Sequence, residues 1–376
     1  MSKSNLNLQE DDTTDEFDFP PPERKIFTQP YDLSLVTLIE QWKSGNLELP
    51  DMQREYVWDN GRASRLIESF ILNIPVPPIY FAETEDAVLQ VIDGNQRVQS
   101  IVRYFNNEFA LSGLRVLSEY SRKRFHELPE REQRFLRNRT IRAIVISHDS
   151  HPNMKFEVFE RLNTGGIALN AQELRNSLYR GKLNEKLKVL AKDHAFRECI
   201  GTQNPRRRMV DDELILRWFA MYDDLPDYRP PLKRFLNEYM DRNRDQAEEW
   251  LSMREDIFRG TMKRINRILG PRAFRLIDPT GDPLNDEHGK PFPRSVNRAL
   301  YDAQSLSFSW VISDEEEENN KEVIKTIGEV LTHYDFQEAV RRATGNKDRL
   351  FLRVNMMVAA LEKAGLRIDL PYALVE

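Results

Sequence analysis

The sequence predicts an α+β N-terminal domain followed by an all-helical C-terminal domain. Up to about residue 180, apolar runs of strand length alternate with helical patterns, whereas helix-type periodicity predominates beyond it. The 376 residues also exceed what one hydrophobic core usually serves. We therefore expect a disordered acidic tail over residues 1–30, an α+β domain over 31–185 and a helical domain over 186–376, with the boundary near 180–205.

The composition is that of an ordinary soluble protein. Hydrophobic residues make up 40% and charged residues 31% of the chain, and no apolar run approaches the ~18 residues that a membrane helix needs. The first residues are acidic and contain neither a basic start nor an apolar stretch, so we expect no secretory signal and a cytoplasmic protein. The single cysteine, Cys199, excludes an internal disulfide, and we expect it to be a small buried residue.

Local patterns predict the elements of the first domain. Leu35, Leu38, Ile39 and Trp42 recur at helical spacing, and Gly45 follows where that helix would stop. Asn170 and Glu173 match a capping box at the start of another helix, which Gly181 is placed to end. The remaining elements are a helix after 59–61, two strands at 79–82 and 88–92 that can pair as a hairpin, a helix from about 95, a strand at 140–147 and a helix from about 152 to 163.

The sharpest feature for function is the segment Asp93-Gly94-Asn95-Gln96-Arg97. A strand that leads through a glycine turn directly into a helix places main-chain N–H groups at the helix start, where an anion can bind. Gly94 would let the backbone approach a phosphate, and Arg97 offers a forked cation. Gln96 can position a water or a base, and Asp93 can hold a metal such as Mg²⁺ or a ribose hydroxyl. An ordinary Asp-Gly turn is the alternative.

Three further motifs accompany this segment in a fixed order. The chain contains Leu49-Pro50-Asp51-Met52-Gln53-Arg54-Glu55-Tyr56-Val57-Trp58, the pair Pro77-Pro78 before a strand, and Phe159-Glu160-Arg161-Leu162-Asn163-Thr164-Gly165-Gly166. Over residues 33–180 this order resembles the N-terminal domain family of GmrSD-type restriction endonucleases, also known as domain of unknown function number 262. The resemblance implies a ParB/sulfiredoxin-like fold for the first domain.

The resemblance also implies roles for individual residues. Asp93–Arg97 would form the phosphate-binding turn for a nucleoside triphosphate, with Asp93, Gln96 and Arg97 as the catalytic residues of an NTPase. Gly94, Asn95, Asn163, Thr164, Gly165 and Gly166 would complete the nucleotide site. Gln53, Arg54 and Tyr56 would sense a substrate, either modified DNA or the nucleotide. Structural roles are the alternatives: an ion pair for Arg54, core packing for Tyr56 and a helix C-cap for Gly165 and Gly166.

One position departs from the family pattern. The usual first glutamine of the Asp-Gly-Gln-Gln-Arg box is Asn95 here, which is one methylene shorter. If that side chain orients the attacking water, an error of about 1 Å can cost ~100-fold in rate. The sequence therefore supports nucleotide binding more strongly than nucleotide hydrolysis.

Charge is distributed unevenly along the chain. The net charge is −6, yet basic residues gather at 206–208 and in a longer cluster formed by Arg122, Lys123, Arg124, Arg131, Arg134, Arg137, Arg139 and Arg142. The longer cluster is interpreted as a solvated helix face balanced by glutamates, with contact to DNA as the alternative.

The leading hypothesis is a nucleotide-binding, NTP-hydrolysing sensor or regulatory subunit of a restriction or anti-phage system that acts on DNA. A nuclease centre of the His-Asn-His type needs paired histidines, and only Asp286-Glu287-His288 faintly resembles its start. We therefore expect a separate nuclease or methyltransferase subunit as partner, and a homo-oligomer stays open. A non-enzymatic ParB-like DNA-binding protein and a nuclease built on the same fold are the rival hypotheses.

Overall fold

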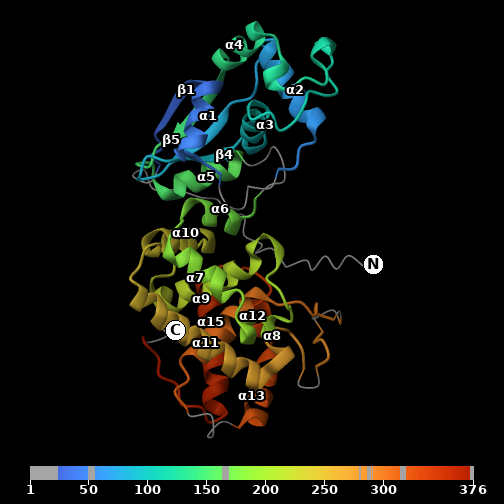
Figure 1. Cartoon of the computed structure of the whole chain (residues 1–376). Coiled ribbons are helices and arrows are strands. Elements are labelled where there is room, and N and C mark those ends of the chain that lie inside the picture. Colours follow the sequence, from blue (N-terminus) through green and yellow to red (C-terminus); the bar gives the residue numbers. More distant parts are fainter. Residues whose placement is uncertain are drawn as a thin grey trace. The chain divides into compact units, whose positions relative to one another are not determined.

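The computed structural model describes residues 24–49, 56–162, 169–278, 281–285, 289, 291–313 and 319–372 (Figure 1). These residues fall into two compact units, which divide between Ser177 and Leu178. We call residues 24–177 the N-terminal unit and residues 178–372 the helical unit. The architecture is the expected one, a mixed α+β unit followed in the chain by a unit built almost wholly of helices.

A five-stranded mixed sheet organises the N-terminal unit. Its strands lie in the order β1-β5-β3-β4-β2. The pairs β1–β5 and β3–β4 are antiparallel, and β3–β5 and β2–β4 are parallel. The strands are β1 Thr28–Ser34, β2 Leu47–Glu48, β3 Ile79–Glu83, β4 Leu89–Asp93 and β5 Thr140–Ile146. The hairpin expected from the two apolar runs is therefore confirmed as β3–β4.

Sequence signals mark the starts of several helices of the N-terminal unit. Ser34 caps α1, and Gly45 ends it with a φ of 77°. Asp59 caps α2 by accepting a hydrogen bond of 2.7 Å from the Arg62 N–H. The helices are α1 Leu35–Ser44, α2 Asn60–Ile71, α3 Asn95–Phe105, α4 Glu130–Asn138, α5 Pro152–Leu162 and α6 Ala171–Leu178.

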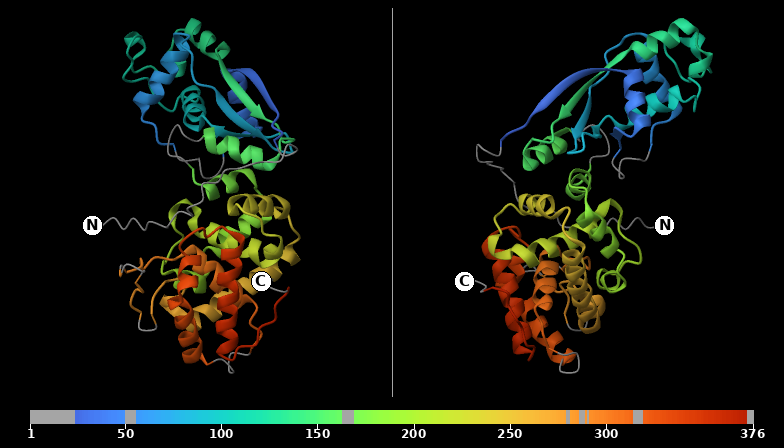
Figure 2. Two further views of the ribbon diagram at one scale, coloured as in Figure 1. Left: turned by 180° about the vertical axis from the view of Figure 1, so that it is seen from behind. Right: turned by 60° about the vertical axis from the view of Figure 1, so that its left-hand side comes forward.

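One face of the sheet carries the hydrophobic core. Ile79 and Phe81 alternate on β3, and Ile141, Ala143 and Val145 alternate on β5, as the two-residue period of a strand requires. These side chains pack with buried residues of α1, α2 and α3, which Figure 2 shows gathered on one side of the strands. The packing fixes the end of β4 against the start of α3.

Three features of the fold differ from the sequence expectations. Residues 28–30, expected in the disordered tail, belong to β1; residues 1–23 lie outside the described part. The strand was missed because most of its side chains are exposed and its pairing with β5 uses main-chain atoms. The two-residue strand β2 was also missed. Gly181 does not end α6, which stops at Leu178, but precedes the next helix, where its missing side chain makes room for the Arg244 carbonyl.

Helices form the described part of the helical unit. Within it Cys199 is buried, as expected, and burial raises the pKa of its thiol to about 12. The helices are α7 Lys182–Leu190, α8 His194–Ile200, α9 Val210–Asp224, α10 Leu232–Asn243, α11 Glu248–Leu269, α12 Arg298–Ser309, α13 Asn320–Thr332, α14 Tyr334–Ala339 and α15 Lys347–Lys363. In the portions of the chain that the structure describes, no helix combines the length and the apolar character needed to cross a bilayer.

A buried ion cluster lies at the centre of the helical unit. Asp302 on α12 accepts hydrogen bonds from Arg217 on α9 at 2.9 and 2.7 Å, and from Arg353 on α15 at 3.0 Å. Arg353 also donates to the carbonyls of Ala339 and Thr344. One carboxylate thus joins three helices around two buried cations.

The loop after α3 is fastened to α2 by a single carboxylate. Glu68 is buried, and its oxygens accept hydrogen bonds from the main-chain N–H groups of Arg115, Val116 and Leu117 at 2.8–3.1 Å. Burial alone would raise the pKa of Glu68, but the hydrogen bonds from Leu117, Val116 and Arg115 and the charge of Arg115 lower it below its ordinary value. The ionised form is therefore the one that holds the loop.

Replacing Glu68 by glutamine is expected to destabilise the N-terminal unit by about 1.5–3 kcal/mol, the value of hydrogen bonds to a charged group. The wild-type contribution should be present above the unfolded pKa and disappear as the pH falls through the lowered folded pKa, because protonation removes the acceptor charge. Chemical denaturation between pH 3 and 7 measures this. The difference between wild type and E68Q should shrink at the acidic end, and a difference independent of pH would contradict the assignment.

Candidate functional site

The turn between β4 and α3 places main-chain groups at the start of a helix. β4 ends at Asp93, and Gly94 caps α3 with a φ of 99° and no side-chain hydrogen bond to the helix start. The Val98 N–H donates to the Gly94 carbonyl at 2.9 Å. N–H groups in the first turn of a helix have no acceptor within that helix, and they carry its positive end. The strand, turn and helix start expected from the sequence are thus present.

Gly94 has a left-handed backbone conformation and leaves no space for a side chain. A Cβ at this position would lie 3.0 Å from Nη2 of Arg97 and 3.0 Å from Cγ1 of Ile79. The conformation also belongs to the region of positive φ that residues with a side chain rarely adopt. Only glycine therefore lets the turn pass this close to the guanidinium.

Arg97 lies over the turn and is held there by local contacts. Its Nη2 donates to Oδ2 of Asp93 at 2.7 Å and to the Pro78 carbonyl at 3.1 Å. The side chains of Arg97 and Asp93 are 16% and 37% exposed, so the pair borders on solvent. Among the described residues, the buried Nε of Arg97 has no hydrogen-bond acceptor. The guanidinium thus retains a donor beyond its pairing with Asp93.

The two amides of the motif are engaged within the unit. Oε1 of Gln96 accepts hydrogen bonds from the main-chain N–H groups of Val57 and Trp58 at 2.9 and 3.2 Å. Oδ1 of Asn95 accepts from Nε2 of Gln99, one turn further along α3, at 2.7 Å. A water-orienting role for Gln96 stays a prediction, and the contacts give this residue a positioning role in addition.

Tyr56 is docked on α3 rather than in the core cluster. Its hydroxyl lies 2.9 Å from Oγ of Ser100, and the guanidinium of Arg103 stacks 4.2 Å from the centre of its ring. The side chain is half-buried. Together with Gln96, these contacts join the segment that follows Arg54 to the same helix that begins at the Gly94 turn.

Part of the expected site falls outside the described residues. Gln53 and Arg54 precede the first described residue of their segment, and Asn163, Thr164, Gly165 and Gly166 follow the last residue of α5. His288 and the acidic residues beside it are outside as well. The capping box after this gap is confirmed, since Asn170 and Glu173 exchange hydrogen bonds of 2.7 and 2.8 Å.

Sequence reasoning missed the residues that support the motif from elsewhere in the chain. Pro78 supplies a carbonyl to Arg97, and Ile79 forms the apolar floor of the turn. Ser100 and Arg103 hold Tyr56. A signal was present for the last two, because Gln96, Ser100 and Arg103 recur at helical spacing and share one face of α3.

No metal site is preformed among the described residues, where no three His, Cys, Asp or Glu side chains converge as ligands. Mg²⁺ commonly binds through one or two carboxylates together with the phosphates of its substrate and water. Asp93 fits that pattern as a single half-exposed carboxylate. Any Mg²⁺ at this turn would therefore depend on oxygens that a nucleotide brings.

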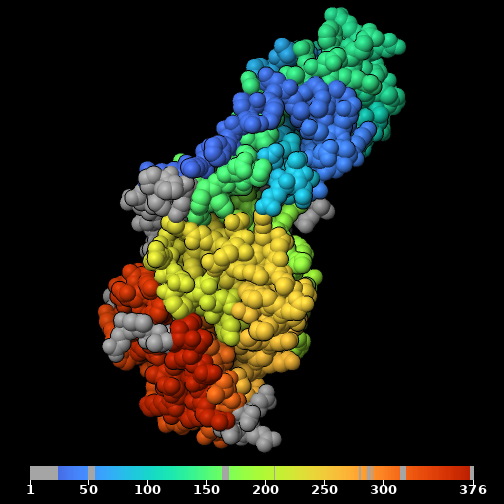
Figure 3. All heavy atoms as spheres, turned by 90° about the vertical axis from the view of Figure 1, so that its left-hand side faces the viewer, coloured from blue at the N-terminus to red at the C-terminus, as the bar shows by residue number. Residues whose placement is uncertain are grey.

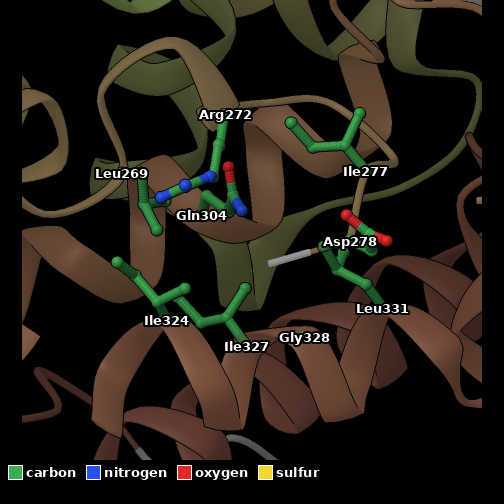
Figure 4. A pocket seen from close by; sticks show the side chains of 9 residues that line it. All are labelled: Leu269, Arg272, Ile277, Asp278, Gln304, Ile324, Ile327, Gly328 and Leu331. Carbon is green, nitrogen blue, oxygen red and sulfur yellow. The ribbon is translucent and has the colours of Figure 1, made fainter. Parts of the chain in front are cut away.

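A pocket in the helical unit is too small to compete as the nucleotide site. Figure 4 shows it above α13, lined by apolar side chains together with Gln304, Arg272 and Asp278. Its volume of about 20 Å³ holds roughly one water molecule. A wider hollow of about 330 Å³ contains Glu338 and Arg341, whose charged atoms lie 3.9 Å apart and offset each other. Neither presents a phosphate-binding turn.

The first unit is thus an α+β domain in which a glycine turn opens a helix beside a held arginine. Residues 35–180 match the family model described as "GmrSD restriction endonuclease, N-terminal domain". The match covers less than half of the chain and confirms the resemblance expected from the four motifs. No curated protein matches the chain.

Proposed function

We propose that this protein is a component of a DNA restriction or defence system whose N-terminal unit, ParB/sulfiredoxin-like in fold, binds a nucleoside triphosphate at the Asp93–Arg97 turn. The observation that carries the proposal is the close approach of the Arg97 guanidinium to Gly94, where an added Cβ would lie 3.0 Å from Nη2. It joins the positive start of α3 and a guanidinium in one place, and phosphate groups bind where these two features meet. The family match supports the restriction context.

Each residue of the turn has a definite part in the proposal. Gly94 lets phosphate oxygens approach the main chain, and Arg97 donates to them from its unused edge while Asp93 orients its Nη2. Asp93 holds Mg²⁺ once the nucleotide supplies further oxygens. Gln96 fixes the Tyr56 segment beside the turn, so that substrate sensing by Gln53 and Arg54 is coupled to the nucleotide.

Binding is proposed ahead of hydrolysis. The carboxamide oxygen of Gln96 already accepts two main-chain hydrogen bonds, and Asn95 is shorter than the glutamine usual in the family. Both features weigh against fast turnover. The partner is proposed to be a separate nuclease or methyltransferase subunit, with DNA cleavage coming from a nuclease and DNA as the shared substrate.

Replacing Arg97 by alanine is expected to weaken nucleotide binding about 10- to 100-fold, because one charged hydrogen-bond donor contributes ~1.5–3 kcal/mol. Isothermal titration with each of the four ribonucleoside triphosphates and Mg²⁺ measures the affinity, and phosphate release measures turnover.

Arg65→Ala is the matched control, since Arg65 is an exposed arginine on α2. Wild-type affinity in R65A with loss in R97A supports the proposal. Equal affinity of R97A and wild type for every nucleotide, or no binding by either, removes it. Equal phosphate release from the two removes the enzymatic part alone.

A further inference from the structure

A strongly basic surface lies on the N-terminal unit away from the Gly94 turn. Residues 115–142 contain nine arginines and lysines against four glutamates, a net charge of +5 in a chain whose total is −6. Figures 1 and 3 show α4 and the loop before it, coloured teal to green, at one end of the unit. We call its outward residues the α4 basic face: Arg122, Lys123, Arg131, Arg134 and Arg137.

Specific contacts make this face a single surface. The guanidinium of Arg137 on α4 stacks 5.5 Å from the ring centre of Phe125 in the preceding loop. Gln133 of α4 donates from Nε2 to the carbonyls of His126 and Leu128 in that loop, at 3.2 and 2.9 Å. Buried Leu136 sets the inner side of the helix, so that Arg131 and Arg134 point outward. The loop and the helix therefore present their cations together.

Few of these cations are neutralised by the protein. In the described part of the chain, Arg122, Lys123, Arg131 and Arg137 form no ion pair, and the last three stack on aromatic rings instead. Arg134 pairs with Glu130 at 3.3 Å, but the two side chains are 69% and 88% exposed, and such pairs contribute ~0–1 kcal/mol. A balanced, solvated helix face would show more pairing than this.

The arginines on either side of this face hydrogen-bond to the main chain of the protein, so we do not include them in the face. Arg139 donates to the carbonyls of Phe70 and Ile71 at the end of α2, and Arg124 donates to the Asn107 carbonyl. Arg131, Arg134 and Arg137 have no such bonds to main-chain carbonyls among the described residues. Their exposed charge is thus available to a partner.

An aromatic ring accompanies the cations. Phe135 is 43% exposed, and the guanidinium groups of Arg131 and Arg139 lie 5.2 and 5.7 Å from its ring centre. Surfaces that bind nucleic acid without sequence preference combine cations for the phosphates with aromatic rings on which bases stack. A nucleic acid would use both the charges and the ring.

We infer that the α4 basic face binds the phosphate backbone of nucleic acid, with Phe135 available to stack on an unpaired base. The inference deepens the proposed function, and it rests on that function for the restriction context. The face is remote from the nucleotide turn. Phe105 at one end of α3 stacks on Phe125 at 4.4 Å, Gly94 caps the other end, and the eleven residues between span about 16 Å.

The test is binding of the full chain to a labelled 30-mer, single-stranded or duplex, across 50–300 mM salt. The triple variant Arg131→Gln, Arg134→Gln, Arg137→Gln should bind about 10- to 100-fold more weakly at 100 mM salt, and its log–log salt slope should be smaller by about two to three. The matched control removes three exposed cations of the helical unit: Arg229→Gln, Lys263→Gln, Lys321→Gln. It should bind like wild type.

Nucleotide titrations on the same proteins separate this inference from the proposed function. Loss of nucleic acid binding in the triple variant with intact nucleotide binding supports the surface. The same loss in the triple variant supports it even if the wild-type chain binds nucleic acid but no nucleotide, in which case only the proposed function fails. If wild type prefers the single strand and Phe135→Ala removes that preference, Phe135 stacks on an unpaired base. If wild type binds both forms equally, the surface binds the phosphates alone. Equal loss in the control, no binding of either form by wild type, or binding only of an acidic polypeptide overturns the inference.

Discussion

Replacing Asp302 by alanine is expected to lower the free energy of unfolding of the helical unit by about 3–5 kcal/mol. Asp302 is 1% exposed and is the carboxylate that both Arg217 and Arg353 contact at 3.0 Å or less. Without it, two buried guanidinium groups lose the carboxylate that they share. Breaking a buried pair in this way costs far more than the intact pair contributes.

Denaturant unfolding followed by circular dichroism measures the effect. Asp302→Asn keeps the shape and some hydrogen bonds but removes the charge, so it should fall between alanine and wild type. Asp256→Ala, on the exposed side of α11, is the control and should change the unfolding free energy by less than about 0.5 kcal/mol. Similar values for D302A and D256A would contradict the central role of the cluster.

Replacing Gly94 by alanine is expected to destabilise the N-terminal unit by about 1–3 kcal/mol and to abolish nucleotide binding. A left-handed conformation costs a residue with a side chain ~1–2 kcal/mol. The added Cβ would also meet Arg97 and Ile79 at 3.0 Å, so the guanidinium must leave its place beside Asp93. The stability of the N-terminal unit and its nucleotide binding should therefore both decrease in G94A.

Gly113→Ala separates the two causes. Gly113 also has a positive φ, 63°, but the nearest atom to an added Cβ is 3.9 Å away. It should show the backbone strain alone, a loss of about 1 kcal/mol, and should bind nucleotide like wild type. Thermal unfolding with and without nucleotide measures both quantities. If G94A kept the nucleotide-dependent rise in melting temperature, the turn would not be the phosphate site.

The sequence predicted the elements that have a local signature. The hairpin of β3 and β4 and the helix after it could be predicted because two apolar runs of strand length, at 79–82 and 88–92, flank a polar turn, and apolar residues then recur at helical spacing from Val98. β1 has no such pattern, since its side chains are mostly exposed and its stability comes from main-chain pairing with β5, more than 100 residues away. Gly181 was misinterpreted because a glycine after a helix and one before the next look alike in sequence.

The candidate site was predictable only in its local part. The Asp93–Arg97 box could be located from its glycine and its flanking pattern, and it lies within the residues that match the family model. The contacts that complete the box join residues far apart in sequence: Gln96 to Val57 over 39 positions and Arg97 to Pro78 over 19. Such contacts depend on the packing of α3 against the sheet, which no local pattern specifies.

The two hydrogen bonds that Oε1 of Gln96 accepts connect the first turn of α3 to the backbone at Val57 and Trp58. The first turn of a helix is rigid, so a displacement of Gln96 by an arriving anion must either carry the backbone at Val57 and Trp58 along or break both bonds at once. The positions of the two segments are thereby coupled through one amide, and the contact between the Tyr56 hydroxyl and Ser100 is a second attachment to the same helix.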